Sequence, residues 1–337
     1  MRTGGMSLAI DVGGTKVIVA LVDDAGLVYA RVSMATRDAE AIANRLPADG
    51  IGERSTPADH LVRRIANAAA TLIRDTRVMP AGVGFATTGH VDAVAGTVLH
   101  SGLVAGWSGF AVREKVCRAL INAGLPELPV AVDNDGHAMA LAEARFGAAR
   151  GHDHAICVAV GTGVGGGFIL DGQLYRGRQG LAGLVGHSTI AYRGRRCQCG
   201  KRGCLEAYAA GPRIVDEYLR LVRAEGLGER PPAVERLQDV CARAEAGDRV
   251  ATLAIQRGGE YLGAGLASLA NALNPSAIVI GGGVLGAGPL WFDAARDAVM
   301  ARVRHTIAAG LEVVPAVLGS DAVVIGAGVM GMEVMSA

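Results

Sequence analysis

Hydrophobic and polar positions follow a strand period and a helix period in turn along this chain. Short apolar runs at residues 8–10, 17–22 and 27–31 are typical of β-strands. Apolar residues then recur at helical spacing over residues 53–78, and residues 82–86 again form a strand pattern. The first half continues with a predicted helix at 110–123, a strand at 130–132 and a helix at 138–145.

The second half repeats this order. It opens with predicted strands at 155–160, 168–170 and 173–175, followed by helices at 211–223 and 251–273, a strand at 277–280, a further helix and a strand at 311–317. A last helical pattern at 323–335 contains small residues suited to close packing, and we expect it to return onto the first domain.

The order βββαβαβα therefore occurs twice, which predicts an α/β protein of two related domains. We place the N-terminal domain at residues 6–134 plus 323–337 and the C-terminal domain at 135–322. This order resembles the actin-like ATPase (ribonuclease H-like) fold, which implies two domains around a nucleotide cleft.

Each half carries a glycine-rich turn between its first two strands, at Asp11–Lys16 and Gly161–Gly167. Glycine permits positive φ and lets backbone N–H groups approach phosphate oxygens. Neither loop has the G-x-x-x-x-G-K-[ST] spacing, and neither opens a helix. Either loop alone could be a simple tight turn, but their duplication favours a nucleotide site.

Composition describes a globular protein without a polyanionic partner. Of 337 residues, 50% are hydrophobic and 19% charged, and the net charge is +1, so we expect no nucleic-acid partner. The uncharged stretch 261–292 is interrupted by Asn, Pro and Gly-Gly-Gly, which argues against a membrane span. No apolar signal segment precedes Met6, and we expect a cytoplasmic protein.

Three of the six cysteines form the pattern Cys197-x-Cys199-x₄-Cys204, with His187 ten residues before the first. Three thiolates and one imidazole complete a tetrahedral zinc site without water, so we predict structural Zn²⁺ in the loop 187–204. Free thiols or a disulfide are the alternatives, and a reducing compartment disfavours the disulfide. The other cysteines lie in apolar segments typical of buried small residues.

Asp133-Asn134-Asp135-Gly136 follows a predicted strand and precedes a helical run. A carboxylate at a helix N-terminus is stabilised as the anion, so Asp135 could accept a proton from a bound hydroxyl. Ordinary N-capping by Asp or Asn explains the same pattern equally well.

In their order along the chain, these motifs resemble the ROK family (repressors, open reading frames, kinases). The resemblance covers essentially the whole chain and implies an ATP-dependent kinase that phosphorylates the 6-hydroxyl of a hexose. The segments that carry it are Asp11–Lys16, Asp133–Asp135, Gly161–Gly167, Gly183–His187, Cys197–Glu206 and Ile280–Gly283.

The resemblance also implies roles for individual residues. Asp135 would be the general base, Asn134 and Glu206 would bind sugar hydroxyls, and His187 would bind zinc through one nitrogen and face the sugar with the other. Mg²⁺ would accompany ATP near Asp11. The residues implied in nucleotide binding are Asp11, Gly13, Gly14, Thr15, Lys16, Gly161, Thr162, Gly163, Gly281, Gly282 and Gly283.

One departure bears on the substrate. The family motif before the zinc histidine is Glu-x-Gly-His, and Leu184 stands here in place of the acid, so one hydrogen bond to the sugar is lost or supplied elsewhere. Together with the segment 84–92, this is similar to N-acetylmannosamine kinases, and we predict that substrate, with glucose or another hexose as the alternative. Gly89, His90 and Gly102 match positions of the acetyl-side pocket.

Two other classes of function stay open. ROK regulators carry an N-terminal helix-turn-helix, whereas the first strand here begins close to Met6, which argues against DNA binding. A non-catalytic sugar-binding protein is the other alternative. By resemblance to the family we expect a homodimer or homotetramer.

Overall fold

The computed structural model describes residues 5–37, 56–225 and 234–335. The chain divides into two compact units: residues 1–142, 176–182 and 320–337 form the first, and 143–175 with 183–319 form the second. Of the predicted helix at 53–78, residues 53–55 lie outside the described residues. Among the described helices, none is both long enough and apolar enough to cross a bilayer.

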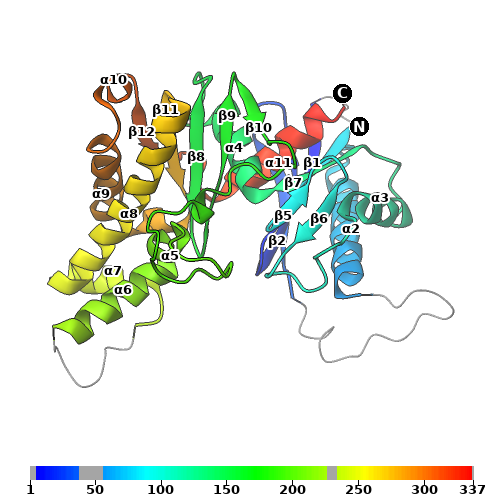
Figure 1. Cartoon of the computed structure of the whole chain (residues 1–337). Helices are drawn as coiled ribbons and strands as arrows, with labels where there is room; N and C mark the ends of the chain where they lie inside the picture. The colour runs from blue at the N-terminus through cyan, green and yellow to red at the C-terminus, as the bar shows by residue number, and fades with distance from the viewer. Residues whose placement is uncertain (1–4, 38–55, 226–233, 336–337) are drawn as a thin grey trace. The chain divides into compact units, whose positions relative to one another are not determined.

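The first unit is built on a five-stranded mixed sheet with the order β3-β2-β1-β4-β7 (Figure 1). The three strands β1, β2 and β3 form an antiparallel meander, and β4 and β7 continue from β1 in parallel. Their bounds are Ser7–Val12 (β1), Lys16–Val22 (β2), Val28–Ala35 (β3), Gly82–Thr87 (β4) and Val130–Asn134 (β7).

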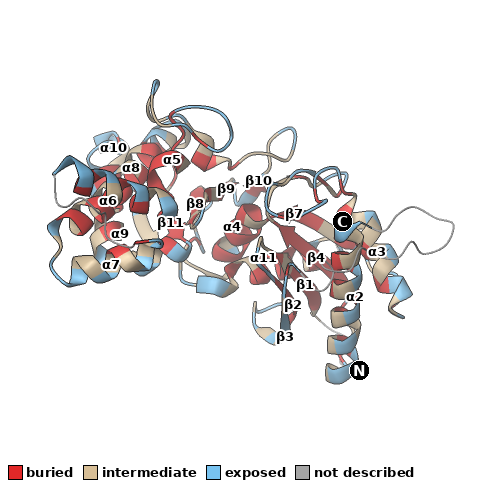
Figure 2. Cartoon of the chain, turned by 90° about the horizontal axis from the view of Figure 1, so that it is seen from below, coloured by how far each residue is buried: buried red, intermediate tan, exposed pale blue. Residues whose placement is uncertain are grey.

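Helices cover both faces of this sheet (Figures 1 and 2). Helix α2 (Pro57–Thr76) and helix α3 (Val112–Asn122) pack together on one face. Helix α2 begins with a capping box, in which Thr56 and Asp59 bond each other's backbone N–H groups. Helix α4 (Asp135–Phe146) and helix α11 (Ala322–Glu333) lie on the opposite face.

Helix α11 packs on β1 and β4 because glycines let the backbones approach closely. A Cβ added at Gly84 would collide with the carbonyl oxygen of Ala327, and one at Gly326 would collide with that of Ala138. Most of the helix is buried, and it has no polar face. The last described segment of the chain therefore completes the core of the first unit.

The second unit repeats the sheet, with the order β10-β9-β8-β11-β12. Strands β8 to β10 form the antiparallel meander, and β11 and β12 extend it in parallel, as β4 and β7 do in the first unit. Their bounds are Ala155–Val160 (β8), Val164–Leu170 (β9), Gln173–Tyr175 (β10), Ala277–Gly281 (β11) and Glu312–Pro315 (β12).

Helix α8 (Arg249–Leu273) is the long central helix of this unit and packs against helices α6 and α9. Apolar residues of β8 and β11 meet these helices in one buried core that includes Trp291 and Leu266 (Figure 2). The remaining helices are α5 (Glu206–Ala209), α6 (Gly211–Ala224), α7 (Leu237–Glu245), α9 (Pro289–Met300) and α10 (His305–Ala308).

Several elements differ from the predictions. Helix α4 begins at Asp135, three residues earlier than predicted, and β9 begins at Val164, so the second glycine turn is confined to residues 161–163. The hairpin of β5 (His90–Asp92) and β6 (Thr97–His100) was not predicted, nor was helix α7. The division by contacts also groups residues 135–142 and 176–182 with the first unit.

Candidate active site and metal centre

Parallel pairing brings the predicted catalytic residues of the first unit to one edge of its sheet. Asp11 on β1 is level with Ala86 on β4, and Ala86 is level with Asp133 on β7. The carboxyl ends of these three strands therefore lie at the same edge, with β4 between β1 and β7, and Asn134 is level with Thr87 at the end of β4. This is the edge at which open parallel sheets bind ligands.

The pKa values of both carboxylates at this edge, Asp11 and Asp135, are raised. Burial and the neighbouring charge of Asp135 raise the pKa of Asp11 to about 7, although Lys16 opposes the shift. Burial raises the pKa of Asp135 to about 6, although hydrogen bonds from backbone N–H groups and the charge of His137 lower it. Asp135 thus has the properties of a proton acceptor near neutral pH.

In each glycine turn, the backbone amide of the first glycine donates a hydrogen bond within the turn. In the first, the Gly13 amide donates to the Lys16 carbonyl oxygen at 2.9 Å, and Thr36 Oγ1 donates to the Gly13 carbonyl oxygen at 2.7 Å. In the second, the Gly161 amide donates to the Gly163 carbonyl oxygen at 2.9 Å. Because these two amides are already hydrogen-bonded within the turns, the neighbouring amides are the candidates for contacts with phosphate.

In the second unit the Gly161 turn lies beside the Gly281–Gly283 turn. Gly282 has φ +92° and packs so closely on the Val160 backbone that no side chain fits there. The Gly211 amide, in the first turn of α6, donates to the Gly161 carbonyl oxygen at 2.8 Å. Two of the predicted nucleotide-binding segments therefore meet within one unit, beside a helix N-terminus.

The predicted acetyl-side residues of the first unit follow β4. Gly89 has φ +114° and links β4 to the hairpin that begins at His90. Trp107 is fully buried and its Nε1 donates to Thr87 Oγ1 at 2.9 Å, which anchors the loop that contains Gly102. A Cβ at Gly102 would meet open space.

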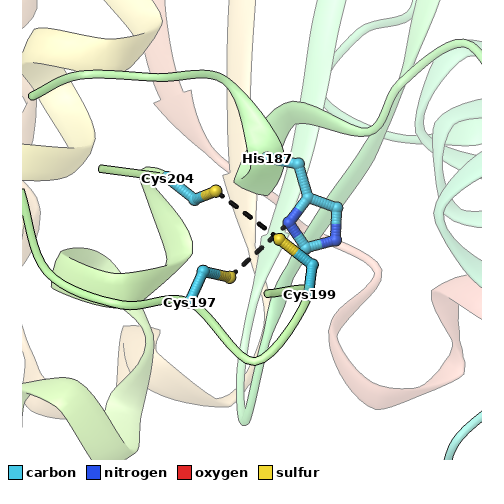
Figure 3. Close-up of side chains that lie close together, drawn as sticks. All are labelled: His187, Cys197, Cys199 and Cys204. Atoms are coloured by element: carbon cyan, nitrogen blue, oxygen red, sulfur yellow. Dashed lines mark hydrogen bonds between the residues drawn. The ribbon is translucent and has the colours of Figure 1, made fainter. Parts of the chain in front are cut away.

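His187, Cys197, Cys199 and Cys204 converge in the second unit, and their ligand atoms all lie within 4.8 Å of one another (Figure 3). The Cys199 and Cys204 sulfurs are 3.7 Å apart, and Cys197 Sγ is 3.8 Å from His187 Nδ1. A tetrahedral zinc with ordinary bond lengths needs about 3.8 Å between sulfurs and about 3.6 Å between sulfur and nitrogen. The donor set and spacing fit Zn²⁺, and Nδ1 is the ring nitrogen on the metal side.

A cluster of three partly exposed arginines around the buried Glu217 holds this loop on the body of the unit. The Arg195 guanidinium stacks on Tyr208 at 4.6 Å and pairs with Glu217, which also binds Arg220 and Arg257. Burial opposes ionisation of Glu217, but the three arginines lower its pKa to about 2. The loop is therefore fixed by paired charges as well as by its cysteines.

Glu206 links the metal centre to the second glycine turn. Its Oε2 accepts from the Val164 amide at 3.0 Å, and its Oε1 lies 3.7 Å from Cys197 Sγ. On the other side, Gly186 packs directly on the Val164 backbone, next to the ligand His187. The start of β9 is thus held between two residues that adjoin the metal ligands.

Sequence reasoning did not single out His137, although it contacts the Asp133–Asp135 segment. His137 is fully buried, and its Nδ1 lies 2.6 Å from Asp133 Oδ1. Arg176 Nε donates to Asp133 Oδ2 at 2.7 Å. The four-residue spacing of Asp133 and His137 at a helix start was the available signal.

Comparisons with known proteins agree along the whole chain. The sequence profile described as ROK family matches residues 7–333. A glucokinase of Streptomyces coelicolor is 32% identical over 302 residues, which cover 87% of this chain and 86% of the relative. An N-acetylmannosamine kinase of Yersinia pestis is 32% identical over 280 residues, which cover 83% of both chains.

The fold is shared with a ROK family glucokinase from Streptomyces griseus, solved in complex with glucose and AMPPNP. That structure has a TM-score of 0.75 and 31% sequence identity, and the match covers 98% of this chain and 100% of the other. The predicted actin-like ATPase fold, with two mixed five-stranded sheets, is confirmed.

Proposed function

Because this chain belongs to the ROK family, we propose that it is an ATP-dependent kinase that phosphorylates the 6-hydroxyl of a hexose. The observation that carries the proposal is Asp135, whose pKa is raised to about 6 at the sheet edge where Asp11 also lies. Similarity to curated kinases over more than four fifths of each chain supports it.

In this proposal Asp135 accepts the proton of the sugar hydroxyl as the phosphorus–oxygen bond forms. Phosphoryl transfer needs a correctly placed, moderate base, and a carboxylate that titrates near pH 6 meets that need. Asn134 follows the same strand and would bind a neighbouring hydroxyl of the sugar. Its Oδ1 accepts from the His137 amide at 2.7 Å, which orients the side-chain amide.

The nucleotide would be bound by the two glycine turns and the Gly281–Gly283 turn. Amides of Gly14, Thr15, Thr162 and Gly163 would donate to phosphate oxygens, and Lys16 would add a positive charge. Asp11 would hold the Mg²⁺ that accompanies ATP and neutralises charge on its phosphates. The S. griseus relative, solved with AMPPNP, supports nucleotide binding.

Zn²⁺ would be held by His187, Cys197, Cys199 and Cys204 and would stabilise the loop structurally, since four protein ligands leave no open position. With Nδ1 on the metal, Nε2 of His187 is free to bind a sugar hydroxyl. Glu206 would accept from the sugar as well, while its Val164 contact holds β9.

Glucose is the acceptor that the comparisons favour. The residues around Leu184 and at 84–92 favour N-acetylmannosamine, but glucokinases are more frequent among the similar curated proteins, and the S. griseus glucokinase aligns with 98% of this chain. We therefore propose a hexose kinase with glucose as its first candidate substrate and N-acetylmannosamine as the second.

A coupled assay of ADP release tests this proposal with glucose, N-acetylmannosamine, N-acetylglucosamine, mannose and allose. We expect glucose to give the highest kcat/KM and the product to be the 6-phosphate by NMR. Sugar binding by calorimetry without ADP release from any of the five would contradict the kinase proposal and favour a non-catalytic sugar-binding protein or a regulator.

A homodimer or homotetramer stays a prediction of the family resemblance. Light scattering on the eluting protein would measure it against the 34.4 kDa of one chain.

A further inference from the structure

His137 is a buried histidine whose two ring nitrogens both face hydrogen-bond acceptors. Nδ1 lies 2.6 Å from Asp133 Oδ1, and Nε2 lies 2.8 Å from the carbonyl oxygen of Ala182. A carbonyl oxygen can only accept, so Nε2 must carry a proton for this bond to exist. The protonation of Nδ1 then depends on the state of Asp133.

Asp133 is surrounded by donors. Its Oδ1 accepts from the Asn134 amide at 2.8 Å and its Oδ2 from Arg176 Nε at 2.7 Å. Burial opposes ionisation, but His137 and Arg176 outweigh it and hold the pKa of Asp133 below its usual range. Asp133 is therefore a carboxylate that accepts from Nδ1, and the geometry requires both nitrogens of His137 to be protonated.

The charges near this imidazolium balance only when Asp135 is included. Asp133 carries one negative charge against the positive charges of His137 and Arg176, which leaves one positive charge unmatched. Asp135 lies two residues before His137, and the charge of His137 lowers its pKa. The charge of Asp135 in turn raises the pKa of Asp11. A cationic His137 thus favours the ionised form of Asp135.

The same network fixes the segment 176–182 at both ends. Arg176 at its start binds Asp133, and Ala182 at its end binds His137. All these residues belong to the first unit. In addition, the backbone N–H of His137 donates to Asn134 Oδ1 at 2.7 Å.

We propose that His137 is a doubly protonated positioning residue, which ties Asp133 to Ala182 beside Asn134 and Asp135 and supplies the positive charge that keeps Asp135 ionised. The role in turnover rests on the kinase function proposed above. The protonation state of His137 does not depend on that function, so an experiment can contradict the kinase function without contradicting the protonation state.

NMR of the full-length protein labelled with ¹⁵N-histidine tests the protonation state without any assay of activity. The His137 signals are identified by their loss in His137→Asn. We expect both ring nitrogens of His137 to have the chemical shifts of protonated nitrogen at pH 7, because both face acceptors. A neutral tautomer of His137 at pH 7 would overturn the proposal.

Kinetics of His137→Asn and His137→Gln test the positioning role. Both amides can donate to Asp133, but neither carries a charge. We expect kcat to fall about tenfold or more, with KM for sugar and ATP changed less than about threefold. The acid limb of the kcat profile should move up by about one pH unit, because the pKa of Asp135 rises without the nearby cation.

His152→Asn is the matched control, since the Nδ1 of His152 bonds Ser276 within the second unit, whereas Asp135 and Asp133 belong to the first. It should leave the kcat profile unchanged. Wild-type kcat and an unmoved acid limb in both His137 variants would overturn the positioning role, even if the NMR result held. If His137→Asn does not fold, the loss of the same signals in His137→Gln assigns them.

Discussion

At the scale of single residues, the raised pKa of Asp135 favours its use as a base but makes the folded protein less stable near neutral pH. Its pKa lies near 6 in the folded protein, above the value of about 3.9 expected for the unfolded chain. The folded state therefore binds the proton more tightly, and this group lowers the free energy of unfolding as pH rises from about 4 to about 7. A residue kept for packing alone would not carry this cost.

Asp135→Asn should lower kcat at least about 100-fold, because the amide cannot accept the hydroxyl proton. Sugar binding, measured by calorimetry, should be nearly unchanged. At pH 7 the variant should be more stable by on the order of 2 kcal/mol in urea unfolding, because the buried carboxylate is gone. Asp293→Asn, in an exposed pair with Arg296, is the control and should change neither quantity. Turnover within a few-fold of wild type would show that Asp135 is not the base.

Leu184 directly precedes the short 3₁₀ turn that carries His187. Leu184→Glu should raise kcat/KM for glucose relative to N-acetylmannosamine, because a carboxylate can accept a hydroxyl hydrogen bond that leucine cannot. Leu184→Met, which keeps the site apolar, is the matched control. An unchanged ratio between the two sugars in Leu184→Glu would remove this position from the account of specificity.

The sequence pointed to individual site residues wherever a motif fixes their spacing. Three cysteines and a histidine identified the four-residue cluster correctly, because few other residue sets have that chemistry. Residues that act through tertiary neighbours were missed. His137 acquires its role from Ala182, forty-five residues away, and no local pattern encodes that contact.

At the scale of elements, the loop 187–204 is the part most dependent on a ligand. Protein purified without added metal should contain about one zinc per chain by mass spectrometry of the metal, since the four donors complete a tetrahedron. Cys204→Ser should lose the zinc and lower the melting temperature, whereas Cys241→Ser, outside the cluster, should keep both. A wild-type protein that is free of metal and fully active would contradict the site.

The contacts of Glu206 with Val164 and Cys197 link zinc binding to the second glycine turn, and so to nucleotide binding. Because Glu206 and Gly186 hold the start of β9, removal of zinc by a chelator should weaken the binding of an ATP analogue even without sugar. Titration calorimetry can measure this directly. Equal affinity before and after chelation would mean that the turn 161–163 is rigid without the metal.

Segments bounded by clear turn signals were predicted better than segments without them. Strands β8 and β10 have the predicted bounds because each apolar run ends at a turn. The hairpin β5–β6 was missed because strands of three and four residues show too few alternations. Helix α4 was predicted three residues short because Asp135 and Gly136 are typical of turns, yet here they form its first turn.

On the scale of the whole molecule, the two sheets share one strand order, and each glycine turn joins the first two strands of its sheet. The duplication was visible in the sequence because the apolar runs and glycine turns recur in the same order. It was harder to predict from the sequence which helix covers which sheet, because this depends on close backbone contacts such as that between Gly84 and Ala327.

A chain that ends at Gly319 should lose the native first unit and keep the second. The truncation removes α11, whose buried residues pack on β1 and β4. Hydrogen exchange should show loss of protection over β1, β2 and β4, with β8 and β11 still protected. A chain that ends at Glu333 retains α11 and is the control. Protection of β1 in the shorter chain would show that the first sheet is stable without this helix.

The return of α11 also sets an order of maturation in the cell. Translation delivers Ser7 long before Gly328, and the Ser7 hydroxyl donates to the Gly328 carbonyl oxygen at 2.8 Å within the first unit. Residues 143–319, by contrast, contain the whole second unit, interrupted by residues 176–182 alone, and this unit can fold as soon as the stretch leaves the ribosome. The half of the protein that is synthesised first therefore has to wait, with an apolar sheet face uncovered, until residues 322–333 have been made, and it is this half that we expect chaperones to bind.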